Sequence, residues 1–271
     1  MKLEDGIFRR SSLLLGDDVM QRIKTAKVII FGVGGVGGWC AESLVRSGVQ
    51  HLTVVDSDRI CVTNINRQVM ATCKTVGQIK VEALKERLLD INPGAQIEPI
   101  QQIYSKETRD MFHLETYDYI IDAIDSLSNK IDLILTATQM PAVFFSSMGA
   151  ALKIDASKIR VAEFWKVKGC PFAAIIRKKM KRTGYPAKKF LTVFSDEVLP
   201  NRGENLSCGS PQCLCPKIVP TSPDDTLANH EWCSAKARIN GTSAHITAIF
   251  GFTLAGLVVQ DITAKIKMPQ L

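Results

Sequence analysis

The chain has 271 residues, of which 46% are hydrophobic and 23% are charged, and its net charge at neutral pH is +7. This composition excludes a disordered chain and predicts one large globular domain, or one domain with an appended lobe. The positive net charge favours an anionic partner but does not determine the fold.

The first five residues of the segment before the first predicted strand, 1–26, include two acids and no apolar run. We therefore expect no secretory signal, a cytoplasmic location and reduced cysteines. Apolar spacing further along predicts short helices, with Asp17 or Asp18 as a cap. Arg10 also lies here and is ordinarily a surface charge.

A run of β-branched and aromatic residues, 28–31, leads directly into a glycine-rich turn. Gly32, Gly34 and Gly37 form its G-x-G-x-x-G frame, Gly35 lies within it, and a helix-like segment follows. Such glycines allow a tight turn and a close approach to a phosphate at the helix N-terminus. A second strand ends at Asp56, about 20 residues past the turn, where a ribose-binding acid is expected. Together these features predict a nucleotide site.

Strands and helices alternate through the first half of the chain. The strands are expected at 27–31, 51–55, 96–101, 119–124 and 142–147, and the helices at 39–47, 78–90 and 130–140. This alternation predicts an α/β, Rossmann-like, doubly wound and mostly parallel sheet with helices on both faces.

The pattern changes after residue 150, and we divide the chain into a nucleotide-binding core (1–150) and a C-terminal lobe (151–271) continuous with it. The lobe should contain an antiparallel edge strand (159–167), a strand at 190–194, a loop over 200–231 and a helix over 243–262. The uncharged stretch 239–259 is long enough to span a bilayer. Because it also contains polar residues, a buried core or dimer-interface helix is the better interpretation, without membrane contact.

Residues 177–189 are dense in Lys and Arg around Tyr185. A run of basic residues is commonly a solvent-exposed surface of the protein. It also fits a nucleic acid, with Lys and Arg along the phosphates and Tyr185 stacked on a base.

Polar residues gather after the second strand and at the end of the fourth: Asp58, Asn64, Arg67, Gln68, Lys80 and Asp125. Singly, each is typical of a cap or a surface group. Together, beside a glycine turn, cations and carboxylates favour ATP with Mg²⁺. The turn is not of the Walker type. A nicotinamide oxidoreductase is the default for this fold, but no His or Tyr proton donor stands in an obvious motif.

The joint motif resembles the adenylating domain of the ubiquitin-activating-enzyme-like superfamily, which includes activators of sulfur-carrier proteins. The resemblance implies ATP cleavage at the α-phosphate and an acyl-adenylate. It implies that Asp56 holds the ribose, that Asn64, Arg67 and Lys80 hold phosphates, and that Asp125 binds Mg²⁺. It also implies a homodimer in which Arg10 reaches the partner's site.

Three segments narrow the resemblance to the tRNA threonylcarbamoyladenosine dehydratases: 63–68, 121–126 and 249–252. That family adenylates the threonylcarbamoyl carboxylate of a modified adenosine and closes a ring, with net loss of water and release of AMP and pyrophosphate. An activator of a ubiquitin-like or sulfur-carrier protein remains the alternative.

The late cysteines leave two questions open. Cys233 falls where the dehydratases carry a cysteine, and it would either form a thioester or line the pocket. Cys208, Cys213 and Cys215, with Cys233, could hold a structural Zn²⁺, although their spacing is not the paired C-x-x-C of zinc-bearing members. This cysteine cluster is a departure from the dehydratase pattern.

Overall fold

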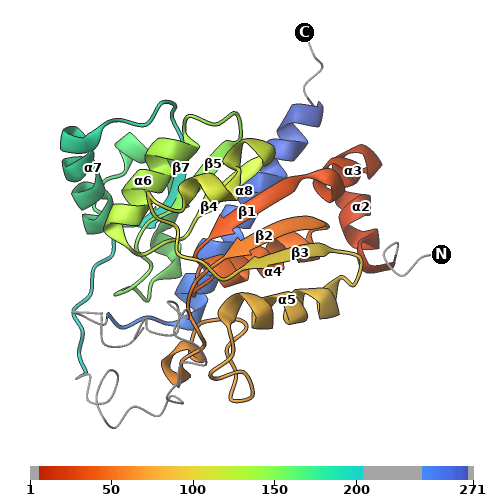
Figure 1. Ribbon diagram of the computed structural model, residues 1–271, viewed down its shortest axis with the longest axis horizontal. Coiled ribbons are helices and arrows are strands. Elements are labelled where there is room, and N and C mark those ends of the chain that lie inside the picture. Colours follow the sequence, from red (N-terminus) through yellow and green to blue (C-terminus); the bar gives the residue numbers. More distant parts are fainter. Residues whose placement is uncertain (1–5, 204–239, 268–271) are drawn as a thin grey trace.

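The computed structural model describes residues 6–203 and 240–267. These residues form a seven-stranded sheet with the strand order β3-β2-β1-β4-β5-β7-β6 (Figure 1). The strands are β1 (Lys27–Phe31), β2 (His51–Val55), β3 (Gln96–Ile100), β4 (Tyr119–Asp122), β5 (Val143–Ser147), β6 (Ile159–Glu163) and β7 (Leu191–Ser195). All neighbouring pairs are parallel except β6 and β7. The predicted Rossmann-like α/β fold is confirmed, including the antiparallel edge strand.

The α-helices are α2 (Arg9–Leu15), α3 (Asp17–Thr25), α4 (Gly37–Arg46), α5 (Lys80–Ile91), α6 (Leu127–Ala137), α7 (Pro171–Thr183) and α8 (Ala244–Lys267). Short 3₁₀ turns cover Val62–Asn64, Arg109–Phe112, Leu114–Thr116, Ala156–Lys158 and Phe164–Lys166.

The two faces of the sheet bury separate hydrophobic clusters because side chains alternate along each strand. Val28 and Ile30 of β1 face a cluster that includes α3, α4, α5 and α8. Ile29 and Phe31 face the opposite cluster, which includes α6 and α7. The helices on both faces follow from this two-sided burial.

Two local expectations need correction. Gly16 is the N-cap of α3, and Asp17 and Asp18 lie in its first turn, where their charges still favour the helix dipole. The basic stretch 177–189 was not predicted as helix, yet its first half belongs to α7. Ala173, Ile176 and Met180 of α7 are buried beneath the basic residues. The density of charge hid this apolar stripe.

Helix α8 is the described element that is long and apolar enough to cross a membrane. Its side chains Ile246, Phe250, Leu254 and Val258 are buried against the first half of the chain. Gly251 lies so close to α4 that a Cβ there would stand 2.5 Å from the Val36 carbonyl oxygen. The interpretation of α8 as a core helix is confirmed.

Candidate active site

A cavity of about 740 Å³ opens beyond the carboxyl ends of β1, β2 and β4. The chain changes direction between β1 and β4, which is where open α/β sheets bind ligands. Ten residues singled out from the sequence line it: Gly32, Gly34, Gly35, Asp56, Asp58, Asn64, Arg67, Gln68, Lys80 and Asp125. The volume is typical of a small-molecule site.

Three positions of the turn require glycine, each for a different steric reason. Gly32 has a φ of +83°, and a Cβ there would lie 2.8 Å from the Ala123 carbonyl oxygen. A Cβ on Gly37 would lie 1.9 Å from the Gly32 carbonyl oxygen, so this glycine allows α4 to pack on the turn and does not line the cavity. A Cβ on Gly34 would meet only Gln68 Nε2, at 3.7 Å. Gly34 therefore keeps space open on the cavity side.

The beginning of α4 provides an anion site. Helix α4 starts at Gly37, and no side chain caps it. The first N–H groups of a helix have no acceptor within the helix and carry the positive end of its dipole. The buried Gln68 Oε1 has no hydrogen-bond partner. A polar ligand in this cavity would satisfy these groups, and the nucleotide expected from the sequence fits the residues present.

Asp56, at the end of β2, is held rigidly. Its carboxylate accepts the Val33 and Asp58 backbone N–H groups, each at 2.9 Å. Lys80 Nζ lies 2.6 Å from Asp58 Oδ2 and 3.7 Å from Asp56 Oδ1. Burial lowers the pKa of Lys80, but the two carboxylates outweigh it and the net shift is upward. Lys80 is thus a fixed cation, although only 5% of its side chain is exposed.

Arg67 lines the same cavity and follows the 3₁₀ turn Val62–Asn64. Its Nη1 donates to the Thr63 carbonyl at 2.7 Å and to Asn66 Oδ1 at 3.0 Å. Its own carbonyl accepts the Trp39 indole N–H at 3.0 Å. Asn64 Oδ1 accepts the Cys61 N–H at 2.9 Å, so Asn64 also shapes the loop that carries Arg67.

Asp125 lines the cavity beyond the end of β4 and contributes to the raised pKa of Lys80. Within residues 6–203 and 240–267, no group of three or more His, Cys, Asp or Glu forms a metal cluster. Mg²⁺ often takes only one or two protein carboxylates and completes its shell with substrate phosphates and water. The donor set around Asp125 fits such an ion.

A protein-family comparison matches residues 8–269 to the ThiF family model. The chain belongs to the ThiF family. It is 32% identical to the tRNA threonylcarbamoyladenosine dehydratase of Bacillus subtilis, with 97% of both chains covered. The crystal structure of the Escherichia coli tRNA N6-threonylcarbamoyladenosine dehydratase in complex with ATP matches with a TM-score of 0.78 and 27% identity, covering 97% of this chain and 96% of that one. The E. coli molybdopterin-synthase adenylyltransferase is 30% identical over 55% of this chain and 59% of its own.

Some predicted site residues of this ThiF-family chain lie elsewhere. Arg10 is exposed on α2 and does not line the cavity of its own chain. Cys233, with Cys208, Cys213 and Cys215, lies outside the described residues, so the thioester and zinc hypotheses stay predictions.

Sequence reasoning missed three residues of this ThiF-family site. Lys153 and Cys170 line the cavity on the side of the C-terminal lobe. Burial lowers the pKa of Lys153, whose ammonium donates to the Glu197 carbonyl. Lys130, below the cavity floor, forms a buried ion pair with Asp122. Only Lys130 had a visible signal, as the one base in the predicted helix after Asp125.

Proposed function

We propose that this chain is an ATP-dependent tRNA-modifying enzyme that adenylates the threonylcarbamoyl carboxylate of a modified adenosine and cyclises it. The observation that carries the proposal is the match to dehydratases over 97% of both chains. An adenylation site alone would not separate this activity from carrier-protein activation, because the superfamily shares it. The match extends through the C-terminal lobe, which also contributes residues to the lining of the cavity.

The chain's own residues suggest how ATP is held. The N–H groups at the start of α4 and the cations of Arg67 and Lys80 would neutralise the phosphates, and Asp56 would bind the ribose. Bound Mg²⁺, held by Asp125, would supply charge neutralisation on the phosphates. The fixed position of Lys80 supports this arrangement, since preorganised charge needs no rearrangement during the reaction.

The steps of the reaction are those that the similarity to the dehydratases implies. A carboxylate oxygen of the substrate attacks the α-phosphorus, the bond to the bridging oxygen breaks and pyrophosphate leaves. The neighbouring carbamoyl group then attacks the activated carbonyl carbon, and AMP leaves with the former carboxylate oxygen. The net change in the nucleoside is the loss of one water.

An activator of a sulfur-carrier or ubiquitin-like protein is the second candidate. It is supported by the 30% identity to a molybdopterin-synthase adenylyltransferase, which covers only about half of this chain. In that case a protein C-terminus, not a nucleoside, would enter the cavity.

The experiment that separates the two is AMP release by the pure protein with ATP and Mg²⁺. We expect release that depends on tRNA carrying the threonylcarbamoyl group, and a nucleoside lighter by one water in mass spectrometry. AMP release that requires a small carrier protein would transfer the assignment to the second candidate. No AMP under either condition would contradict adenylation itself.

We also propose a cytoplasmic homodimer without membrane contact. Helix α2 buries none of its residues, and Leu13 and Leu14 are 81% and 79% exposed. A second copy covering this face would remove those leucines from water. In that arrangement Arg10, on the same helix, would lie next to the interface, and the superfamily resemblance implies that it reaches the partner's site.

A further inference from the structure

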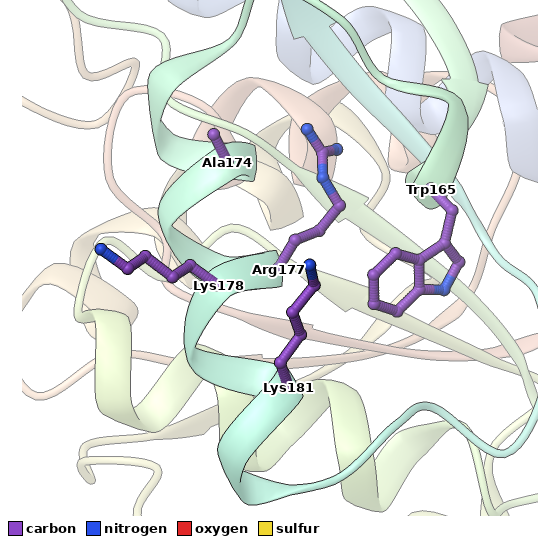
Figure 2. A pocket seen from close by; sticks show the side chains of 5 residues that line it. All are labelled: Trp165, Ala174, Arg177, Lys178 and Lys181. Carbon is purple, nitrogen blue, oxygen red and sulfur yellow. The ribbon is translucent and has the colours of Figure 1, made fainter.

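A second hollow, of about 340 Å³, lies on the surface between the 3₁₀ turn Phe164–Lys166 and α7. It is lined by Trp165, Ala174, Arg177, Lys178 and Lys181. In Figure 2 the side chains of Arg177 and Lys181 extend toward the Trp165 indole, and Lys178 extends from the other side of the helix. The spacing of three and four along α7 brings Ala174, Arg177 and Lys181 to one side of the helix. We call these residues the α7 groove.

The α7 groove is strongly and uniformly positive. The segment 164–195 contains nine Lys and Arg residues and no Asp or Glu, while the whole chain has a net charge of +7. Within the described part of the chain, neither Lys178 nor Lys181 forms an ion pair. Arg177 is fixed differently, because Nη1 donates to the Phe164 carbonyl at 3.0 Å and its guanidinium lies 5.7 Å from the Phe164 ring centre. Unpaired cations beside a fixed guanidinium favour a polyanion.

Exposed aromatic rings adjoin these cations. Trp165 is 38% exposed and Tyr185 is 64% exposed, and their ring centroids are 5.7 Å apart. Trp165 also packs edge-on against the buried Phe164, which orients the indole. Aromatic faces next to Lys and Arg are the pattern with which proteins bind single-stranded RNA, by stacking bases and pairing phosphates.

The α7 groove is connected to the active site by the helix itself. Pro171 and Phe172, in the first turn of α7, line the large cavity. A rise of 1.5 Å per residue places Lys178 and Lys181 roughly 10 to 15 Å further along the axis. A strand whose modified nucleoside enters the cavity would therefore cross the α7 groove within a few nucleotides.

We propose that the α7 groove docks the single-stranded loop of the tRNA substrate, with one unpaired base stacked on Trp165 and the flanking phosphates held by Arg177, Lys178 and Lys181. This inference rests on the proposed function and names the surface through which the substrate is recognised. It separates RNA docking, on α7, from ATP binding, at the start of α4.

The first test compares two double variants that each remove two positive charges. K178A/K181A changes the α7 groove, and K24A/K27A changes exposed lysines on α3 and β1, at the opposite side of the molecule (Figure 1). Binding to tRNA carrying the threonylcarbamoyl group is measured at several salt concentrations. Each phosphate contact contributes roughly 0.7 to 0.9 to the magnitude of the slope of log K against log salt. Because K178A/K181A removes two contacts, we expect it to reduce that magnitude by about 1.5. The control variant should keep the wild-type slope.

The second test concerns stacking. W165A should weaken tRNA binding about tenfold or more, and W165F should recover much of this loss because it keeps an aromatic face. KM for tRNA should rise in W165A, whereas KM for ATP should not change. Circular dichroism establishes that each variant is folded.

The outcomes distinguish this inference from the proposed function. If the wild-type protein does not release AMP with the tRNA, the proposed function is wrong, and the inference with it. If the wild-type protein does so but K178A/K181A and W165A bind tRNA as the control does, only the inference is overturned. Equal losses in both double variants would also overturn it, because binding would then follow total charge and not the α7 groove.

Discussion

Lys130 Nζ lies 2.7 Å from Asp122 Oδ2, and both side chains are completely buried below the candidate ATP site. Lys130 also donates to the Ile124 carbonyl at 3.0 Å, and the Ser146 hydroxyl donates to Asp122 at 2.7 Å. These bonds hold the turn between Asp122 and Asp125. The pair therefore connects the core of the sheet to the predicted Mg²⁺ ligand.

Removing one member of this pair should be costly. We expect Lys130→Ala to lower the free energy of unfolding by about 3–5 kcal/mol, because Asp122 is left buried without its cation. Urea denaturation measures the change. The double variant Asp122→Asn/Lys130→Met should recover most of it, and a double variant as unstable as the single one would show that the ion pair is not the cause.

The glycine turn allows a test in which neighbouring glycines behave differently. Gly37→Ala should prevent stable folding, since its Cβ would overlap the Gly32 carbonyl oxygen. Gly34→Ala should fold but bind ATP about tenfold more weakly, because its methyl group would occupy space where a phosphate approaches the backbone. Calorimetric titration with ATP measures this.

Gly256, within α8, is the matched control. A Cβ there meets nothing within 4 Å, so Gly256→Ala should stabilise the protein by about 0.5–1 kcal/mol and leave ATP binding unchanged. If Gly34→Ala bound ATP as tightly as Gly256→Ala, the phosphates would not lie against this turn.

Arg67→Ala and Asp125→Ala should each abolish AMP release and leave the thermal midpoint within a few degrees of the wild-type value. Both residues line the cavity, and neither belongs to the buried core. Turnover and thermal unfolding are measured on the same preparations. Unchanged turnover in both variants would refute the site assignment.

Acid stability should depend on Asp118, which pairs with Arg22 at 2.7 Å. Burial would raise the pKa of Asp118, but the hydrogen bonds from Arg22 and from the Lys27 backbone N–H, together with the positive charges of both residues, outweigh it, and the net pKa lies below the usual value of an Asp. A carboxylate with a depressed pKa stabilises the fold above its unfolded pKa, and this contribution is lost as pH falls through the folded pKa. Asp118→Asn should therefore flatten the loss of stability below about pH 4, measured by urea midpoints.

The proposed homodimer depends on the apolar face of α2. Leu13→Glu/Leu14→Glu should give a monomer in analytical ultracentrifugation, because charged side chains would be buried at the interface. Met111→Glu, at an exposed apolar residue outside α2, should sediment as the wild-type protein does. A dimer that persists in the α2 variant would place the interface elsewhere.

The parts of the fold that follow a regular period could be predicted from the sequence. The bounds of β1 and β2 agree with the expectation, and α5 and α6 differ by a few residues, because each element has one clear apolar face. Ten cavity residues were also expected, since the carboxyl ends of parallel strands meet at one edge. The helical start of the basic stretch was missed, because charges surround its apolar stripe.

Other features of the site depend on contacts between residues far apart in the sequence. The burial of Lys153 depends on Glu197, and the ion pair of Lys130 depends on two neighbouring strands. Neither partnership leaves a local pattern, although Lys130 itself stands out as the one basic residue in the predicted helix after Asp125. The same holds for the α7 groove, in which Trp165 and Lys181 meet only after a 3₁₀ turn and a helix have formed.

The close approach of Gly251 to α4 has a consequence for biosynthesis. The glycine turn leaves the ribosome about 200 residues before α8 has been made, which at ~5–20 residues per second means roughly 10 to 40 seconds. During that time the apolar side of α4 that α8 will cover stays exposed, and the nascent chain is a natural client for a chaperone. A messenger truncated anywhere before α8 should therefore yield an aggregating fragment and not a working ATP-binding half.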